Sequence, residues 1–370
     1  MRIATLQFAP KLGDVNGNIE RANTLLKKGK IISVDGKQLG IGLGVDLLKP
    51  DVLVLPEMAL TGYNFPSLEA ITPYLETFGD GPSSSWARET AKLLQCTVCV
   101  GYPEVEKDPR NPEKKTCYNA LLVVDKNGDF IHNYRKSFLY MSDEPWAAEG
   151  DVERSFRELR FPTQKASIVD TSQLVSETKD TQIATSFGIC MDINPYKFEA
   201  PFDKWEFATR VLDSKSQLVI LSMAWTSMMS AEELEQLKDK PDMENFNYWL
   251  QRFWPLIKRK MQHQVDLDGE APGSPKRIII VFANRSGEDP PADETKPPVQ
   301  YVGSSTIIAI TQQPEKDTGS GASESETEDD LPFDVKILCW DMLGAREEGI
   351  CFADTTADPK MVFALKRTSE

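Results

Sequence analysis

The 370-residue sequence contains only two histidines, His132 and His263. This scarcity excludes a metal site built from several histidines, and it leaves few candidates for a Cys-His or Ser-His catalytic pair. If the protein is an enzyme that moves protons, the proton carrier is expected among its carboxylates and lysines.

Long apolar runs and an excess of positive charge are also missing. No run approaches the roughly 18 apolar residues needed to cross a bilayer, so a membrane protein is not expected. Lys and Arg number 42 against 57 Asp and Glu, a net charge of -15 that argues against binding nucleic acid or an anionic membrane. The first residues, "MRIATLQFAP", resemble a strand and not a signal region, so secretion is not expected either.

Cysteine is present but sparse, with six residues unevenly spaced along the chain. This spacing does not form a disulfide framework, and it favours a reducing, cytoplasmic compartment. The segment "CTVC" (96–99) matches a C-x-x-C pattern, but no second pair exists and its neighbours alternate as in a strand. We therefore do not expect a metal site there.

The order of predicted elements defines the fold class. Strand-like runs alternate with helical patterns near 16–29, 83–94, 203–212 and 231–262, which predicts an α/β protein. The strands are expected at 3–9, 51–57, 96–103, 119–125, 128–136, 182–190, 216–225, 277–285, 304–310 and 335–342. The turn "DKNG" (125–128) is typical of a hairpin, so the sheet is predicted to be mixed.

Several segments rich in Gly, Pro, Ser or acidic residues interrupt this pattern. They are expected to be loops at 31–50, 264–276 and 286–300, and an acidic, flexible insertion at 312–332. None is followed by a new style of sequence. We therefore predict a single domain, 1–370, with long insertions.

Three predicted strands end in reactive side chains, namely Glu57, Lys136 and Cys190. Ligands collect at the carboxyl ends of strands in α/β sheets, because loops and helix N-termini converge there. Singly, each residue has an ordinary role as a loop cap, a solvated strand end or a buried cysteine. Together they supply a thiol nucleophile, a carboxylate base and a fixed cation, the groups that an amide hydrolase needs.

In this order and local setting, the three residues resemble the Glu-Lys-Cys triad of the nitrilase (carbon-nitrogen hydrolase) superfamily. Further similar segments are "QFAPKLGDVNGNIERA" (7–22), "LPEMALTGY" (55–63), "ANRSGED" (283–289) and "YVGSSTIIA" (301–309). The resemblance implies an α-β-β-α sandwich, in which two mixed sheets pack face to face with helices outside.

The resemblance also implies a mechanism. Glu57 would take the thiol proton of Cys190, and Lys136 would stabilise the thiolate and then the oxyanion, with the Met191 backbone N–H as second donor. Ammonia would leave from a thioester, which water activated by Glu57 would hydrolyse. No metal, nucleotide or organic cofactor has a part in these steps.

Further residues are assigned by position in the same family. Glu144, eight residues after Lys136, corresponds to a second glutamate that orients the lysine or the substrate, with Asp143 beside it as a competitor. Asp192 is expected either to contact substrate or to form structural hydrogen bonds. Tyr63 and Trp225 are expected as pocket walls, with core packing as the alternative.

The segments after the cysteine, "CMDINPYKFEAPFDKWEFA" (190–208), and around the lysine, "YRKSFLYMSDEPWAAEG" (134–150), depart from most of the superfamily. They resemble the fungal amidases that act on N-terminal Asn and Gln of proteins. This implies deamidation of peptides or proteins with a free N-terminal Asn or Gln, which feeds the degradation pathway that reads N-terminal residues.

Two other functions remain open from the sequence. One is a small-molecule amidase or N-carbamoyl hydrolase with the same triad, and the other is a catalytically silent binding scaffold, against which the intact triad argues. Relatives often form dimers, and the acidic insertions leave a monomer or a homodimer as alternatives.

Overall fold

The computed structural model describes residues 1–29, 33–34, 37–38, 44–170, 173–262, 275–293, 295–314 and 333–364. Residues 31–32, 35–36 and 39–43 of the first predicted loop, 264–274 of the second, and 315–332 of the acidic insertion lie outside these ranges. No helix in the described part is long and apolar enough to cross a membrane. The single-domain prediction stays a prediction.

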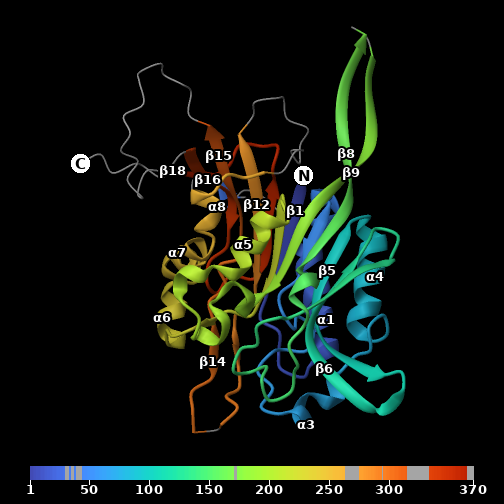
Figure 1. Ribbon diagram of the computed structural model, residues 1–370, viewed down its shortest axis with the longest axis vertical. Coiled ribbons are helices and arrows are strands. Elements are labelled where there is room, and N and C mark those ends of the chain that lie inside the picture. The colour runs from blue at the N-terminus through green and yellow to red at the C-terminus, as the bar shows by residue number, and fades with distance from the viewer. Residues whose placement is uncertain are drawn as a thin grey trace, which may run out of the picture.

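Two mixed sheets form the centre of the fold, as the sequence predicts (Figure 1). The first has the order β17 (Gly349–Asp354), β1 (Arg2–Gln7), β4 (Val52–Val54), β5 (Thr97–Asp108), β6 (Asn111–Val124) and β7 (Phe130–Arg135). The second has the order β18 (Met361–Ala364), β16 (Phe333–Met342), β15 (Thr306–Pro314), β12 (Lys276–Asn284), β10 (Leu218–Met223), β9 (Gln173–Ile189) and β8 (Phe156–Asp170).

Both faces of the first sheet are buried, and alternate residues of its strands enter different cores. On β4, Val52 and Val54 join the core that continues into the second sheet, whereas Leu53 packs with the outer helices. Because successive side chains point to opposite faces of a strand, a short apolar run such as "VLVL" is what a doubly buried strand requires.

Helices cover the outer faces. The first sheet is covered by α1 (Val15–Lys28) and α4 (Pro82–Leu94), and the second by α5 (Glu206–Asp213), α7 (Met243–Arg252) and α8 (Pro255–Lys258). Trp249 of α7 stacks on Phe282 of β12 with ring centroids 5.1 Å apart. The run 248–258 therefore packs on the sheet, as predicted, and the long helical pattern at 231–262 is divided into α6 (Ala231–Gln236), α7 and α8.

The remaining helices and strands are short. They are α2 (Val45–Leu48), α3 (Leu68–Ile71), β2 (Ser33–Val34), β3 (Lys37–Gln38), β11 (Thr226–Ser227), β13 (Glu288–Asp289) and β14 (Val299–Tyr301). The segment 286–300, predicted as an exposed loop, thus contains two strands of a small sheet in the order β11-β14-β13.

The predicted turn at 125–128 does join antiparallel strands, β6 and β7. The sequence did not predict β8, which pairs antiparallel with β9 in a long hairpin that projects beyond both sheets (Figure 1). Its sequence lacks a long apolar alternation, so a pattern based on hydrophobic periodicity could not find it.

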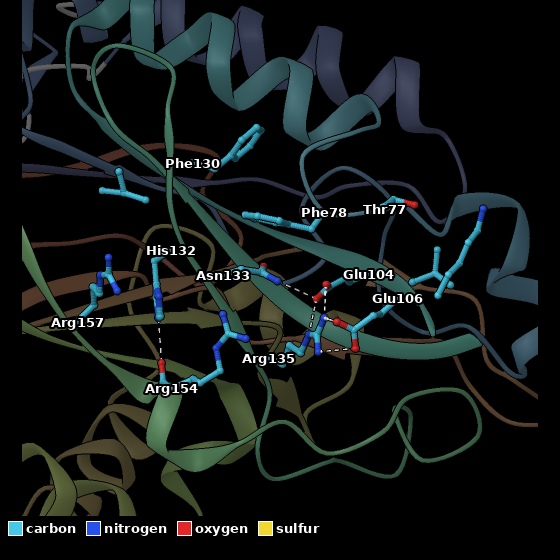
Figure 2. Close-up of a pocket in the computed structure, with 13 residues that line it drawn as sticks. Thr77, Phe78, Glu104, Glu106, Phe130, His132, Asn133, Arg135, Arg154 and Arg157 are labelled. Carbon is cyan, nitrogen blue, oxygen red and sulfur yellow. Dashed lines mark hydrogen bonds and ion pairs between the residues drawn. The ribbon is translucent and has the colours of Figure 1, made fainter. Parts of the chain in front are cut away.

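β7 and β8, each the edge strand of its sheet, border a cavity of about 540 Å³ (Figure 2). His132 of β7 lies in its wall, and its Nε2 is 2.9 Å from the backbone oxygen of Arg154, in the 3-10 turn Val152–Ser155. Burial lowers the pKa of His132 from 6.5 to about 4. The folded protein therefore holds this imidazole neutral at pH 7.

This shift predicts a loss of stability in mild acid. The unfolded chain takes up a proton on His132 below about pH 6.5 while the folded chain does not, so the free energy of unfolding should fall between pH 6.5 and 4. The expected contribution is up to about 3 kcal/mol. Urea denaturation across this range should give a flatter pH dependence for His132→Gln than for the wild type. Parallel curves for the two proteins would contradict this role of His132.

Candidate active site

The three predicted reactive residues lie at strand ends on facing edges of the two sheets. Glu57 follows β4 by three residues, Lys136 comes directly after β7, and Cys190 directly after β9. Lys136 and Glu57 are in direct contact, and the charges of both act on the Cys190 thiol. The fold therefore brings together the groups that the sequence predicts at one site.

Lys136 is fully buried between two carboxylates. Its Nζ donates to Glu57 Oε1 at 2.7 Å and to Asp143 Oδ2 at 2.6 Å, and all three side chains are inaccessible to solvent. Burial disfavours the ammonium, but the charges of Asp143 and Glu57 outweigh it and raise the pKa of Lys136 above its usual value. The lysine is thus a fixed cation that does not titrate near neutral pH.

Glu57 is held by donors on both oxygens. Oε1 also accepts from Asn119 Nδ2 at 2.7 Å, and Oε2 accepts from the Ala224 backbone N–H at 2.8 Å. Burial, followed by the charge of Asp143, raises the pKa of the Glu57 carboxyl, against the opposing effect of Lys136. A carboxylate with raised proton affinity is suited to accept a proton from a weak acid such as a thiol.

Cys190 has a strained backbone conformation at the point where β9 ends. Its φ is +42°, in the left-handed region that non-glycine residues rarely adopt, and a 3-10 turn (Cys190–Ile193) begins there. Burial and the charge of Glu57 raise the pKa of its thiol, while Lys136 and the Ala224 amide oppose that shift. The resting residue is therefore a neutral thiol next to a base, so attack on carbon requires transfer of its proton.

Of the two roles expected for Glu144, contact with the lysine belongs to its neighbour Asp143. Glu144 is exposed, whereas Asp143 is completely buried and binds the lysine. The backbone makes this choice: Asp143 and Glu144 both donate their N–H to the Tyr140 carbonyl in a tight turn that directs only the first side chain inward. The prediction that Glu144 orients Lys136 was wrong, because spacing alone cannot tell which of two adjacent carboxylates faces in.

Asp143 does not have the substrate-binding role considered for it. Both of its oxygens are occupied by protein donors, since Oδ1 accepts from Asn119, and Oδ2 accepts from Lys136, the Tyr140 N–H and the Tyr63 hydroxyl, the last at 3.2 Å. Tyr63 is itself buried, with its ring 5.4 Å from the lysine Nζ. Tyr63 therefore packs against the triad, and its role as a pocket wall stays a prediction.

Asp192 forms structural hydrogen bonds, one of the two roles expected for it. Its Oδ1 accepts the backbone N–H groups of Ser137 and Phe138, and its Oδ2 accepts the Ile189 N–H and the Tyr134 hydroxyl, all within 3.0 Å. It fastens the segment after Lys136 to the turn that carries Cys190. Substrate contact by Asp192 is not supported, because no lone-pair direction is left uncommitted and the side chain is inaccessible.

Two other predicted residues lie next to this centre. Met191 is the second residue of the 3-10 turn, where backbone N–H groups have no partner within the helix and are available to an oxyanion. Its oxyanion role stays a prediction. Trp225 follows Ala224 and is half-buried, and its Nε1 donates to Asn245 at 2.9 Å. Its ring lies 5.7 Å from that of Tyr248 on α7, and its role as a pocket wall stays a prediction.

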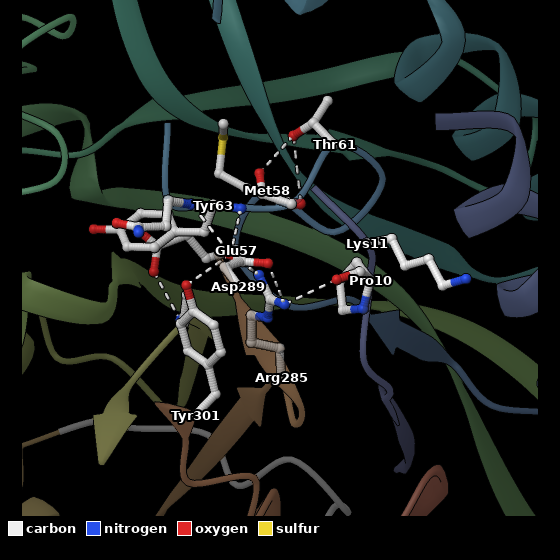
Figure 3. Close-up of polar contacts among 12 residues, drawn as sticks. Pro10, Lys11, Glu57, Met58, Thr61, Tyr63, Arg285, Asp289 and Tyr301 are labelled. Carbon is white, nitrogen blue, oxygen red and sulfur yellow. Dashed lines mark hydrogen bonds and ion pairs between the residues drawn. The ribbon is translucent and has the colours of Figure 1, made fainter. Parts of the chain in front are cut away.

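A second buried ion pair supports the loop after Glu57, and the sequence missed it. Arg285 donates to both oxygens of Asp289 at 2.7 and 3.0 Å, and neither side chain is exposed (Figure 3). Asp289 Oδ2 also accepts the N–H groups of Tyr63 and Asn64, and the Tyr301 hydroxyl at 2.8 Å. The motif "ANRSGED" was noted for its resemblance, but only the fold shows that it clamps this loop.

Changing Asp289 to Asn should destabilise the protein by about 3–5 kcal/mol, because the Arg285 guanidinium would remain buried without its counter-charge. Urea denaturation measures this loss. The matched control is Asp293→Asn, an exposed carboxylate nearby whose bonds are to Thr295, and it should change stability by less than about 0.5 kcal/mol. Equal effects of the two substitutions would contradict the clamp.

The sequence also matches a family model described as carbon-nitrogen hydrolase over residues 2–196, more than half of the chain. The protein belongs to the carbon-nitrogen hydrolase family and is an amidohydrolase by family.

Two curated relatives are protein N-terminal amidases. The one from Saccharomyces cerevisiae is 29% identical over 312 residues, which cover 70% of this chain and 64% of that protein. The one from Schizosaccharomyces pombe is 29% identical over 325 residues, covering 84% of this chain and 92% of that protein. This chain thus matches less than two thirds of the first relative's length and nearly all of the second.

The fold is similar to that of solved N-terminal amidases. A crystal structure of an N-terminal amidase with a Gln-Gly peptide matches with a TM-score of 0.69 at 23% identity, covering 99% of both chains. One with an Asn-Glu peptide matches with a TM-score of 0.68 over the same share of each chain. The predicted nitrilase-like sandwich is confirmed.

Proposed function

We propose that this protein removes the side-chain amide of an N-terminal Asn or Gln from peptides and proteins, giving Asp or Glu and ammonia. The observation that carries the proposal is the buried Glu57–Lys136 pair beside the Cys190 thiol, a base and a cation at a nucleophile. The choice of substrate is supported by the two relatives named protein N-terminal amidase. The site geometry supports amide hydrolysis in general.

The reaction follows from these contacts. The Cys190 sulfur attacks the side-chain carbonyl carbon as its proton passes to Glu57, whose raised pKa favours acceptance. Negative charge develops on the carbonyl oxygen, where Lys136 and the Met191 N–H stabilise it. The C–N bond breaks as Glu57 returns the proton to the leaving ammonia. Water, deprotonated by Glu57, then hydrolyses the thioester and restores the thiol.

The substrate's α-ammonium requires an acceptor, and three carboxylates were considered for it. Asp143 and Asp192 are excluded from this task because protein donors occupy their oxygens. Glu144 is exposed at the start of the segment after the lysine, so it is the one of the three that a substrate can reach. We assign the ammonium contact to Glu144 within this proposal.

The test is ammonia release from four compounds: an Asn-peptide, a Gln-peptide, an N-acetylated Asn-peptide and free asparagine. We expect turnover of the first two, with Cys190→Ala inactive on both. A small-molecule amidase predicts instead that free asparagine or another small amide is preferred. Comparable rates on the acetylated and free peptides would refute N-terminal recognition and favour the general amidase.

Acetylation should lower kcat/KM by at least about a hundred-fold, because the bound substrate then covers the carboxylate without offering it a charged partner. If Glu144 is that carboxylate, Glu144→Gln should reproduce much of the loss on the free peptide and cause little further loss on the acetylated one. The matched control is Glu149→Gln, an exposed glutamate five residues away that bonds to Tyr196. An equal loss on both peptides would contradict this role of Glu144.

The cellular role is also part of the proposal. An Asp or Glu terminus made from Asn or Gln would feed the pathway that reads N-terminal residues for degradation. The proposed partners are polypeptides with a free N-terminal Asn or Gln. The protein would act on them as a monomer or homodimer in the reducing cytoplasm.

A further inference from the structure

Asn119 joins the two carboxylates that share the buried lysine. It lies on β6 and is inaccessible to solvent. Its Nδ2 donates to Glu57 Oε1 at 2.7 Å and to Asp143 Oδ1 at 2.9 Å. Together with Lys136, which donates to the same two carboxylates, it closes a ring of four hydrogen bonds.

The orientation of this amide is costly by itself. Asn119 Oδ1 is buried and has no hydrogen-bond partner among the described residues. An unsatisfied buried acceptor typically costs about 1–3 kcal/mol. Rotating the amide by 180° would instead place this oxygen against two carboxylates, so the two charge-assisted N–H bonds fix Nδ2 where it is.

We infer that Asn119 is a positioning residue, which keeps Glu57 ionised and turned so that it accepts the proton of Cys190. The inference rests on the proposed amide hydrolysis. Lys136 alone must neutralise two carboxylates, leaving one negative charge in excess in a buried site. A neutral donor to both carboxylates favours their charged forms without adding a cation that would compete with Lys136 for the oxyanion.

The experiment compares Asn119→Leu, which removes the donor at nearly constant volume, with Asn119→Ala, which leaves room for a water molecule to donate instead. Asn119→Leu should lower kcat/KM on an Asn-peptide about a hundred-fold, and its acidic limb should move about one pH unit upward. The shift arises because Glu57 loses a donor that favours its ionised form. Asn119→Ala should lie between this variant and the wild type.

A control and a second readout separate this role from a structural one. Asn133→Leu removes a buried amide that donates to Glu104 on the same sheet, so it should cost stability without moving the pH profile. Alkylation of Cys190 by iodoacetamide, corrected with Cys190→Ala, reports thiol deprotonation without any substrate. If the wild type releases no ammonia but the alkylation profile shifts in Asn119→Leu, the proposed function fails and this inference stands. A profile unchanged in Asn119→Leu overturns the inference.

A second, independent observation concerns the cavity between β7 and β8. Arg154 and Arg157 lie on either side of His132 in its wall (Figure 2), and the described part of the chain gives neither arginine an ion-pair partner. Arg157 shares a strand face with the buried Leu159, and the side chains of Arg154 and Arg157 are both exposed to solvent. In a chain of net charge -15, unpaired cations gathered at one cavity stand out.

The carboxylates in the cavity do not cancel these charges. Glu104 and Glu106 are both bound by Arg135, at 2.6 and 2.9 Å. The charge of Arg154 also acts on Glu106, but the cationic side chains of the lining still outnumber its two carboxylates, so the wall has the opposite sign to the whole molecule. We propose that this cavity binds a small oxyanion, a phosphate or carboxylate group, between the two guanidinium groups, whose planar donors match such oxygens.

Isothermal titration with inorganic phosphate tests the proposal, with sodium chloride at matched ionic strength as the reference for screening. Phosphate should bind to the wild type, and Arg154→Gln/Arg157→Gln should weaken it at least about ten-fold. Arg160→Gln, which changes an exposed arginine on the other face of β8, should bind like the wild type. No binding at about 10 mM phosphate, or equal binding to the double variant, overturns the proposal.

Discussion

Serine in place of Cys190 should lower kcat on an N-terminal Asn peptide by about a thousand-fold or more, with little change in Tm. Burial and the charge of Glu57 raise the pKa of the Cys190 thiol, yet a thiol is far more acidic than an alcohol. Glu57 can therefore take the proton of the cysteine but not that of a serine. The side chain is 9% exposed and the substitution changes its size little, so the fold should persist.

Steady-state ammonia release and a thermal melt of the same preparation check both halves of this prediction. Cys117→Ser is the matched control, since this thiol is also 9% exposed but lies within β6 and not at the end of a strand. This variant should keep near-normal activity. A Cys190→Ser protein that retains more than about a tenth of the wild-type rate would contradict the covalent thioester mechanism.

Removing the buried lysine should have the second large effect. Lys136→Met should abolish turnover and reduce the free energy of unfolding by about 3–5 kcal/mol, because Glu57 and Asp143 would remain as uncompensated buried carboxylates. Without the ammonium, burial and the charge of Asp143 raise the pKa of the Glu57 carboxyl above its unfolded value. The folded variant then holds protons that the unfolded chain releases, so its stability should fall as pH rises above about 4.5.

The double variant Lys136→Met/Asp143→Asn separates charge from packing. It removes one carboxylate together with the ammonium, so most of the lost stability should return while activity stays absent. Urea denaturation at pH 5 and pH 8 measures the free energy of unfolding and its pH dependence, and ammonia release measures the activity. If the double variant is no more stable than Lys136→Met alone, the loss comes from packing and the charge argument is wrong.

Much of this architecture is visible in the sequence because burial on both faces leaves apolar runs such as "VLVL" (52–55) and "RIIIVFA" (277–283). Glu57 and Cys190 are found in the same way, since each closely follows a strand with such a run, whereas Lys136 ends the more polar strand-like segment 128–136. The resemblance to the carbon-nitrogen hydrolases, whose family model matches residues 2–196, adds their roles.

The remaining site residues depend on contacts that no local pattern encodes. Asn119 lies within a strand like any other polar residue, and its bonds to Glu57 and Asp143 join positions 62 and 24 residues apart. Asp289 falls in a segment whose Gly and Pro content indicates an exposed loop, and only the partner Arg285 explains its burial. Asp143 and Glu144 differ by one position in a tight turn, so the sequence offered no basis for choosing between them.

Mass spectrometry of the enzyme quenched during turnover of a Gln-peptide tests the central claim most directly. We expect an adduct equal to the peptide mass less ammonia, on the proteolytic fragment that contains Cys190, and no adduct when the peptide is N-acetylated. Turnover with no adduct, or an adduct on another of the six cysteines, would contradict the thioester mechanism.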